Sequence, residues 1–192
     1  MRILVDMDGV IANWGATWDD ALDSYGEHAA DIPRHADQTS FNLNEGRTDD
    51  EKEIIAEIFE SPGFYRHIAP IDGARTALKG LLRAGHDVRI VTSPWVSNPT
   101  CASDKLNWVV EHYGSRWAQR VIITTDKTLV RGDILIDDKP VISGELPEYS
   151  TGANHARSWE HVIFDQPYNR HITNRRRILD WGDIRAIAEI LE

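Results

Sequence analysis

The sequence predicts an α/β protein with a doubly wound, Rossmann-like parallel sheet as its core and a small helical cap inserted after the first strand. The first observation is a set of short aliphatic runs, each about as long as a buried strand, at residues 3–5, 88–91, 121–123, 134–136 and 161–164. The second observation is that amphipathic stretches, typical of helices, lie between these runs. Strands that alternate with helices imply right-handed crossovers and a parallel sheet. The third is a block of different character, residues 15–72, between the first run and the second.

The block between the first two runs is predicted to be helical. Apolar residues recur at helical spacing over 14–25 and indicate a first helix. A second helix is expected to begin at Thr48, where Thr48 and Glu51 have the spacing of a capping box, and to end at the Ser-Pro-Gly turn at 61–63. A cap over one edge of the sheet would be inserted at this place in the chain.

The rest of the chain alternates strands with helices. Helices are predicted over 74–82, 104–113 and 181–191, the last of them capped by Asp180, and a surface loop is predicted over 144–158. The predicted domain organisation is a core made of residues 1–14 and 73–192 and a cap made of residues 15–72.

Composition narrows the class of protein. The chain has 192 residues, 41% of them hydrophobic, which is enough for one substantial core. A net charge of -10 argues against a nucleic-acid polymer as partner, and the one basic run, 175–177, is expected to be a solvated loop or helix end. No apolar run approaches the ~18 residues of a membrane span, so no membrane partner is expected.

The single cysteine and the N-terminus indicate a compartment. Cys101 has no partner for an internal disulfide and fits a reducing environment. The chain enters its first strand without a basic and apolar leader segment. We therefore expect a cytoplasmic protein. The sequence leaves open whether the chain forms a homodimer.

The first strand ends in a motif that suits a cation and a phosphate. Residues 3–5 run into Asp6-Met7-Asp8-Gly9-Val10, which places two carboxylates one residue apart before a glycine that lets the backbone turn. Taken alone, such a motif is as often a surface turn. Its weight comes from its recurrence at other strand ends.

Three later strands also end in polar residues: Thr92-Ser93 follows the second, Asp126-Lys127 the third, and Asp137-Asp138 the fourth. In an open parallel sheet, ligands bind outside the carboxyl ends of the strands, so we expect these side chains to meet. Four carboxylates gathered there would raise one another's pKa unless cations compensate. Lys127 supplies one positive charge, and a divalent metal ion would supply the rest. Because the candidate ligands are all oxygens, magnesium is favoured over zinc.

At these residues the chain resembles the haloacid dehalogenase superfamily of phosphotransferases. The ordered motifs are Asp6-Met7-Asp8-Gly9-Val10, Thr92-Ser93, Lys127 and Asp137-Asp138. Within the superfamily, the chain is most similar to the 5'(3')-deoxyribonucleotidases. That similarity is carried by Val91-Thr92-Ser93-Pro94, Asp126-Lys127-Thr128, Leu135-Ile136-Asp137-Asp138-Lys139-Pro140 and Ser158-Trp159-Glu160-His161-Val162. Residues from about 15 to 72 match only in length and helical character.

The resemblance implies a magnesium-dependent phosphatase that works through an aspartyl phosphate. Asp6 would be the nucleophile, and Asp8 would protonate the leaving oxygen and then deprotonate water. Thr92 and Ser93 would bind the phosphoryl oxygens, and Lys127 would balance the charge. The metal ligands implied are Asp6, the Asp8 main-chain carbonyl and Asp138, with Asp137 supporting the metal shell or Lys127.

The implied substrate is a small molecule, a nucleoside monophosphate such as dUMP or dTMP. In the deoxyribonucleotidases an aromatic pocket on the cap side holds the base and sugar, and by resemblance Trp14, Phe41 and Phe59 would line it. This chain has Asn42 where members of the family carry a second aromatic residue.

Three other kinds of protein share some of these features. A receiver domain uses similar residues around magnesium, but in a different order along the chain. A catalytically silent phosphate- or nucleotide-binding protein would not need every catalytic residue, whereas this chain has all of those that the chemistry requires. A phosphatase for another small phosphomonoester, such as a sugar phosphate, would share the core motifs and differ in the cap.

Overall fold

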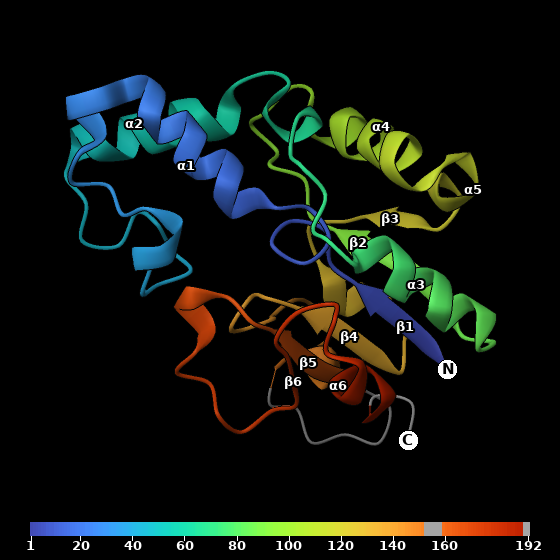
Figure 1. Ribbon diagram of the computed structural model, residues 1–192. Helices are drawn as coiled ribbons and strands as arrows, with labels where there is room; N and C mark the ends of the chain where they lie inside the picture. Colours follow the sequence, from blue (N-terminus) through green and yellow to red (C-terminus); the bar gives the residue numbers. More distant parts are fainter. Residues whose placement is uncertain (152–158, 190–192) are drawn as a thin grey trace.

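The computed structural model describes residues 1–151 and 159–189, which form a six-stranded sheet flanked by helices (Figure 1). The strands are β1 (Arg2–Val5), β2 (Asp87–Thr92), β3 (Val121–Ile123), β4 (Ile134–Asp137), β5 (Glu160–Phe164) and β6 (Arg177–Ile178). Their order is β3-β2-β1-β4-β5-β6, and every neighbouring pair is parallel. The predicted α/β fold with a doubly wound parallel sheet is confirmed.

The strand order reverses at β1. The chain moves outward from β1 through β2 to β3, then crosses back to place β4 on the other side of β1. Such a switch point opens a crevice at the carboxyl ends of the two central strands, where open α/β sheets bind their ligands. The residues that follow β1, β2 and β4 therefore lie at the edge of this crevice.

Six α-helices and six short 3-10 helices complete the described part of the chain. The α-helices are α1 (Trp14–Tyr25), α2 (Asp49–Glu60), α3 (Ala74–Arg83), α4 (Cys101–Tyr113), α5 (Ser115–Ala118) and α6 (Ile184–Glu189). The 3-10 helices are η1 (Gly26–Ala29), η2 (His35–Asp37), η3 (Phe64–Arg66), η4 (Lys127–Leu129), η5 (Pro147–Tyr149) and η6 (Pro167–Asn169). In Figure 1, α1 and α2 lie together, away from the sheet and from α3.

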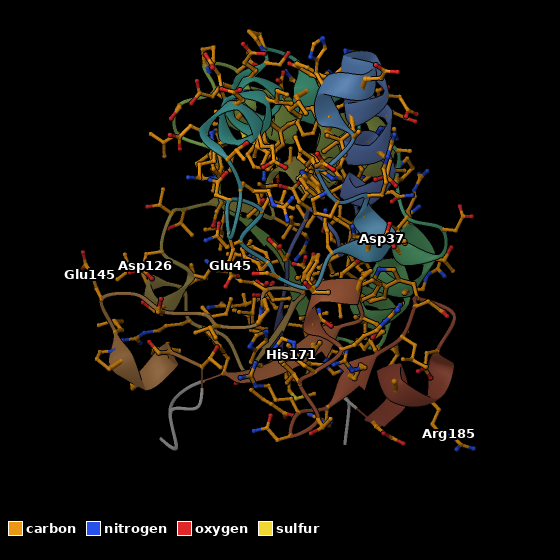
Figure 2. All side chains as sticks on the ribbon, turned by 90° about the vertical axis from the view of Figure 1, so that its left-hand side faces the viewer. Asp37, Glu45, Asp126, Glu145, His171 and Arg185 are labelled. Atoms are coloured by element: carbon orange, nitrogen blue, oxygen red, sulfur yellow. The ribbon has the colours of Figure 1, made fainter. Side chains whose placement is uncertain are left out.

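The central strands β1 and β4 are buried on both faces, which explains their continuous aliphatic sequence. In β1, Ile3 and Val5 belong to one hydrophobic cluster, which includes residues of α3 and α4, while Leu4 belongs to a second on the opposite face. A third cluster forms between α1 and α2, around Trp18 and Ile55. The helical block from α1 to α2 thus has its own small core, and Figure 2 shows it stacked above the sheet.

The predicted boundaries of α2 agree with the structure. The Thr48 hydroxyl accepts a hydrogen bond from the Glu51 backbone N–H at 3.3 Å, and the Glu51 carboxylate accepts one from the Thr48 N–H at 2.7 Å. This capping box satisfies two backbone donors that the helix itself leaves free. The helix ends at Glu60, just before the predicted Ser-Pro-Gly turn.

Two local predictions near the C-terminus were wrong. Asp183, not Asp180, caps α6: its carboxylate accepts a hydrogen bond from the Ala186 N–H at 3.0 Å, whereas Asp180 accepts from the Gly182 N–H. The solvated loop predicted at 175–177 was wrong in part: Arg175 and Arg176 precede the edge strand β6, Arg177 lies in it, and all three residues are partly buried. The end of the predicted last helix, including Leu191, and the end of the predicted 144–158 loop, including Ser158, lie outside the described residues.

The three arginines of that run are engaged within the protein. Arg177 Nη1 contacts Asp165 Oδ1 at 2.7 Å, Arg176 pairs with Glu160 at 2.5 Å, and Arg175 Nη1 donates to the Pro140 carbonyl at 2.8 Å. Two of these contacts are to the acidic residues at the two ends of β5, Glu160 at its start and Asp165 just after it. The run therefore holds the last strand in place.

Across residues 1–151 and 159–189, no helix combines the length and the apolar character that crossing a membrane requires.

Candidate active site

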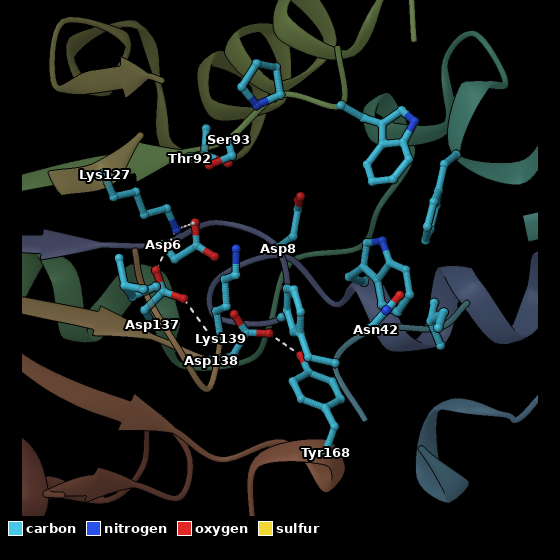
Figure 3. A pocket seen from close by; sticks show the side chains of 18 of the residues that line it. Asp6, Asp8, Asn42, Thr92, Ser93, Lys127, Asp137, Asp138, Lys139 and Tyr168 are labelled. Carbon is cyan, nitrogen blue, oxygen red and sulfur yellow. Dashed lines mark hydrogen bonds and ion pairs between the residues drawn. The ribbon is translucent and has the colours of Figure 1, made fainter. Parts of the chain in front are cut away.

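All ten side chains that the sequence singles out for chemistry or substrate binding line one cavity of about 580 Å³. They are Asp6, Asp8, Trp14, Phe41, Phe59, Thr92, Ser93, Lys127, Asp137 and Asp138. The cavity lies at the carboxyl ends of β1, β2 and β4. The charged members are grouped at one end of it, and Figure 3 shows Asn42 at the other end among aromatic rings.

The loop after β1 is a compact turn that needs its glycine. The Met7 carbonyl accepts backbone hydrogen bonds from Ile11 and Ala12, both at 2.8 Å. Gly9 has φ +72°, and a Cβ built on it would lie 2.6 Å from Asp138 Oδ2. A larger residue would meet both backbone strain and a collision with that carboxylate. Glycine therefore lets the β1 loop and the end of β4 approach closely.

Lys127 bridges two of the strand-end carboxylates. Its Nζ lies 2.6 Å from Asp6 Oδ1 and 2.5 Å from Asp137 Oδ2, and it is 8% exposed (Figure 3). Burial alone would lower the pKa of Lys127, but the Asp137 and Asp6 carboxylates outweigh it and raise that pKa. Lys127 is therefore held as a cation. The preceding Asp126 fixes the turn, because its carboxylate accepts from the Thr128 N–H at 2.8 Å.

Three buried carboxylates are close enough to share a cation. Oxygen atoms of Asp6, Asp137 and Asp138 all lie within 4.8 Å of one another. Burial, together with the neighbouring carboxylates, raises the pKa of Asp6 and raises that of Asp138 well above its usual value. Lys127 offsets only part of this repulsion. A small divalent cation with oxygen ligands fits this set, because its charge would relieve the remaining repulsion.

Tyr168 and Asn169 hold Asp138, and sequence reasoning did not find them. The Tyr168 hydroxyl donates to Asp138 Oδ2, and Asn169 Nδ2 donates to the Asp138 carbonyl at 2.8 Å. Both residues belong to η6, about 30 positions further along the chain. No local sequence pattern marks these two residues, because they come near Asp138 only when β5 pairs with β4 and places η6 beside it.

Lys105 is a second buried cation of the site that sequence reasoning missed. Its side chain is 1% exposed and its Nζ lies 2.5 Å from Asp8 Oδ2, 2.9 Å from Thr92 Oγ1 and 2.8 Å from the Ser93 carbonyl oxygen. It comes from α4, whose other buried residues include Cys101, Trp108 and Val109. A lysine in register with that apolar face was the signal that could have found it.

Asp8 is not one of the three grouped carboxylates, and it contacts a different lysine, Lys105. Burial raises the pKa of Asp8, although Lys105 acts to lower it. One of its oxygens is held by Lys105, while Oδ1 is buried with no hydrogen-bond partner within the described ranges. This carboxyl group therefore has one oxygen, Oδ1, that is free to hold a proton.

The far end of the cavity is built from aromatic side chains of separate segments. Trp14 stacks on Trp18 with ring centroids 5.4 Å apart, and Phe59 lies 5.8 Å from Trp14 and 4.7 Å from Trp95. Phe41 is 44% exposed, and its ring meets the edge of Tyr168 at 5.6 Å. Such flat apolar surfaces favour a planar ligand.

The loop after β2 completes this aromatic surface. Trp95, which sequence reasoning did not single out, follows the Thr92-Ser93-Pro94 segment and reaches Phe59 of α2. Asn98 ties the same loop to the end of α2, because its Nδ2 donates to the carbonyls of Phe59 and Ser61 at 2.9 and 2.8 Å. The aromatic wall is thus fixed to the strand end that carries Thr92.

The fold and this arrangement together define a class of protein. A doubly wound parallel sheet with Asp-x-Asp after its central strand, Thr-Ser after the next, and a lysine between two sets of carboxylates is the arrangement of haloacid dehalogenase-like hydrolases. The family of 5' nucleotidases described as "deoxy (Pyrimidine), cytosolic type C protein (NT5C)" has a sequence model that matches residues 1–191. The chain belongs to this family.

Individual relatives agree with that assignment. A protein from Bordetella bronchiseptica with the provisional name 5'(3')-deoxyribonucleotidase is 41% identical over 189 residues, covering 97% of this chain and 95% of its own length. The human cytosolic-type 5'(3')-deoxyribonucleotidase is 33% identical over 189 residues, covering 95% of this chain and 90% of its own. The predicted membership in the deoxyribonucleotidase family of hydrolases is confirmed.

Solved structures support the fold. A HAD family hydrolase from Deinococcus radiodurans, solved with bound phosphate and sodium, superposes with a TM-score of 0.55 at 15% identity, covering 98% of this chain and 95% of that one. A haloacid dehalogenase-like hydrolase from Xanthomonas campestris gives a TM-score of 0.51 at 14% identity, with 99% and 96% covered.

Proposed function

We propose that this protein is a magnesium-dependent phosphatase that hydrolyses deoxyribonucleoside and ribonucleoside monophosphates to nucleoside and phosphate. The observation that carries the proposal is the single cavity in which a buried group of carboxylates and lysines adjoins an aromatic wall. The charged end suits a phosphoryl group, and the aromatic end suits a base. The names of the relatives support the same substrate class.

In the proposed reaction, Asp6 is the nucleophile. Its carboxylate attacks phosphorus, the bond to the ester oxygen breaks, and an aspartyl phosphate forms. The departing oxygen takes a proton from Asp8, whose raised pKa favours the protonated form at the start. Asp8 then accepts a proton from water, whose oxygen attacks phosphorus and releases phosphate and free Asp6.

The remaining residues stabilise charge during both steps. The Thr92 hydroxyl and the Ser93 backbone amide bind phosphoryl oxygens, and Lys127, 2.6 Å from Asp6, balances the charge of nucleophile and phosphate. Asp6, the Asp8 main-chain carbonyl and Asp138 would hold Mg²⁺, with Asp137 supporting Lys127. When bound, the metal supplies positive charge to the phosphoryl oxygens. Lys105 positions Asp8 and Thr92 through its contacts at 2.5 and 2.9 Å.

We also assign residues 15–72 the role of a cap that covers the substrate. Two features support this role: the separate hydrophobic cluster of α1 and α2, and the position of Phe41 and Phe59 in the cavity wall. Trp14, Phe41 and Phe59 would hold the base and sugar. A cytoplasmic location is proposed from the single cysteine and from the human relative of cytosolic type.

A panel of phosphomonoesters tests the proposal. Phosphate release is measured at multiple turnovers with dUMP, dTMP, dCMP, ribonucleotides and glucose 6-phosphate, each with Mg²⁺ and after its removal by EDTA. We expect the nucleotides to be hydrolysed with the highest kcat/KM and all activity to require Mg²⁺. Faster hydrolysis of the sugar phosphate would favour a different phosphomonoester, and binding without turnover would indicate a silent nucleotide-binding protein.

A further inference from the structure

Gln38 is a buried polar side chain whose amide nitrogen has no partner. It follows η2, and its backbone N–H donates to the His35 carbonyl at 3.3 Å. The residue is 3% exposed, yet it lines the same cavity as Asp6 and Phe41. Its Nε2 is buried without a hydrogen-bond partner in the part of the chain that the structure describes. Buried amide groups nearly always have such partners, so this one needs an explanation.

The wall around Gln38 is neutral and rich in carboxamides. The stretch 38–44 contributes five side chains to the cavity: Gln38, Phe41, Asn42, Leu43 and Asn44. None of them carries a charge, whereas the acidic and basic groups of the cavity come from the strand ends and from Lys139. In Figure 3, Asn42 lies far from Lys127 and close to the aromatic rings. This wall suits the neutral, hydrogen-bonding part of a ligand rather than its phosphate.

We propose that Gln38 determines specificity for the nucleobase by hydrogen-bonding its edge. The inference rests on the proposed function and adds to it the residue that recognises the base. A carboxamide carries a donor and an acceptor side by side, and it can turn to match either order on a base edge. Uracil and thymine present an N–H beside carbonyl oxygens, and cytosine presents a ring nitrogen beside an amino group. An aromatic contact alone does not read these edges, because every base has an aromatic face.

Replacing Gln38 by leucine tests the contact. Gln38→Leu keeps a similar size but has no hydrogen-bonding group. We expect kcat/KM for dUMP to fall at least tenfold, because a bonded partner of the base is lost. Hydrolysis of p-nitrophenyl phosphate, which has no base edge, is expected to stay within about twofold. Gln119→Leu is the matched control, since Gln119 is exposed and does not line the cavity; it should leave both substrates unchanged.

Gln38→Glu distinguishes a contact with the base from a structural role. The two bases differ at ring position 4, where uracil carries a carbonyl oxygen and cytosine an amino group. A carboxylate only accepts hydrogen bonds, so facing that position it would bind the cytosine amino group and repel the uracil oxygen. We expect the ratio of kcat/KM for dCMP over dUMP to rise about tenfold relative to the wild type. A residue that merely supports the fold would change both substrates by the same factor.

The outcomes separate this inference from the proposed function. If the wild type does not prefer nucleotides to sugar phosphates, the proposed function fails first. If the wild type prefers nucleotides but both Gln38 variants leave the ratios between substrates unchanged, the role of Gln38 is overturned. Equal losses on dUMP and p-nitrophenyl phosphate would also overturn it. A selective loss in Gln38→Leu and an altered base preference in Gln38→Glu support it.

Discussion

The two ends of the cavity are built in opposite ways. At the charged end, the carboxylates and Thr92 lie at strand ends or just after them, so the sheet sets their positions: the Asp6 N–H, for example, donates to the Ile136 carbonyl of β4 at 2.9 Å. At the aromatic end, side chains come from a helix start, an irregular loop and the end of another helix. Phe41 meets Tyr168 from more than 120 positions away in sequence. One end depends on strand register and the other on tertiary packing.

This difference has energetic consequences. The charged end gathers groups that repel one another, and their balance depends on Lys127 and Lys105, each 8% exposed or less. Removing one buried charge there leaves another without a partner, which is costly. The aromatic end combines many weak contacts, each of which contributes little by itself. Substitutions should therefore have large effects at the first end and graded effects at the second.

The largest effect is expected for Asp6→Asn. The amide has nearly the same shape, but it cannot form the proposed aspartyl phosphate, so turnover should fall by about 10⁴-fold or more. Steady-state phosphate release at saturating dUMP and Mg²⁺ measures the loss, and circular dichroism checks that the fold persists. If the variant kept a tenth of the wild-type rate, Asp6 could not be the nucleophile.

Lys105→Met should have the next largest effect. Methionine is close to lysine in length but removes the charge beside Asp8 and the donor to Thr92, so we expect kcat to fall about 10²- to 10³-fold. Lys52→Met, on the exposed surface of α2, is the matched control and should leave kcat unchanged. If only KM changes in Lys105→Met, the lysine contributes to binding rather than to the positioning of Asp8.

The two lysines show how far sequence reasoning extends at the charged end. Lys127 was predicted because it belongs to the polar segment that follows a strand, and the structure places it between Asp6 and Asp137. Lys105 was missed although it is more deeply buried than Lys127, since a lysine in a helix is ordinarily exposed to solvent. The strands and the sheet could be predicted from their aliphatic runs. That Lys105 points into the site could not be predicted, because its direction depends on how α4 packs against the sheet.

The aromatic end was predicted only through resemblance. Trp14 has a fixed spacing from Asp8, but nothing in the local sequence places Phe41 or Phe59 in the same wall. Trp95 was not found, because its contact with Phe59 depends on how the loop after β2 meets α2. Gln38 likewise gave no signal, since its burial comes from tertiary contacts rather than from sequence pattern.

Phe41→Ala should sharpen the contrast between the two ends. Base stacking on one aromatic ring contributes about 1–3 kcal/mol, and the exposure of Phe41 favours the lower part of that range. We expect KM for dUMP to rise roughly fivefold to tenfold while kcat changes little. The same variant should hydrolyse p-nitrophenyl phosphate at the wild-type rate. A large fall in kcat for both substrates would mean that Phe41 supports the charged end instead.

The smallest expected effect concerns the α1–α2 block itself. Thr48→Ala removes the capping box of α2 and should destabilise this helix by about 1 kcal/mol, without altering the sheet. Native-state hydrogen exchange should become faster in α2 while β1 and β4 stay equally protected, because the block has its own hydrophobic cluster. Thr39→Ala, at an exposed position in the same block, is the control and should leave exchange unchanged. Equal loss of protection in α2 and the central strands would show that cap and core unfold as one unit, against the proposed division at residues 15–72.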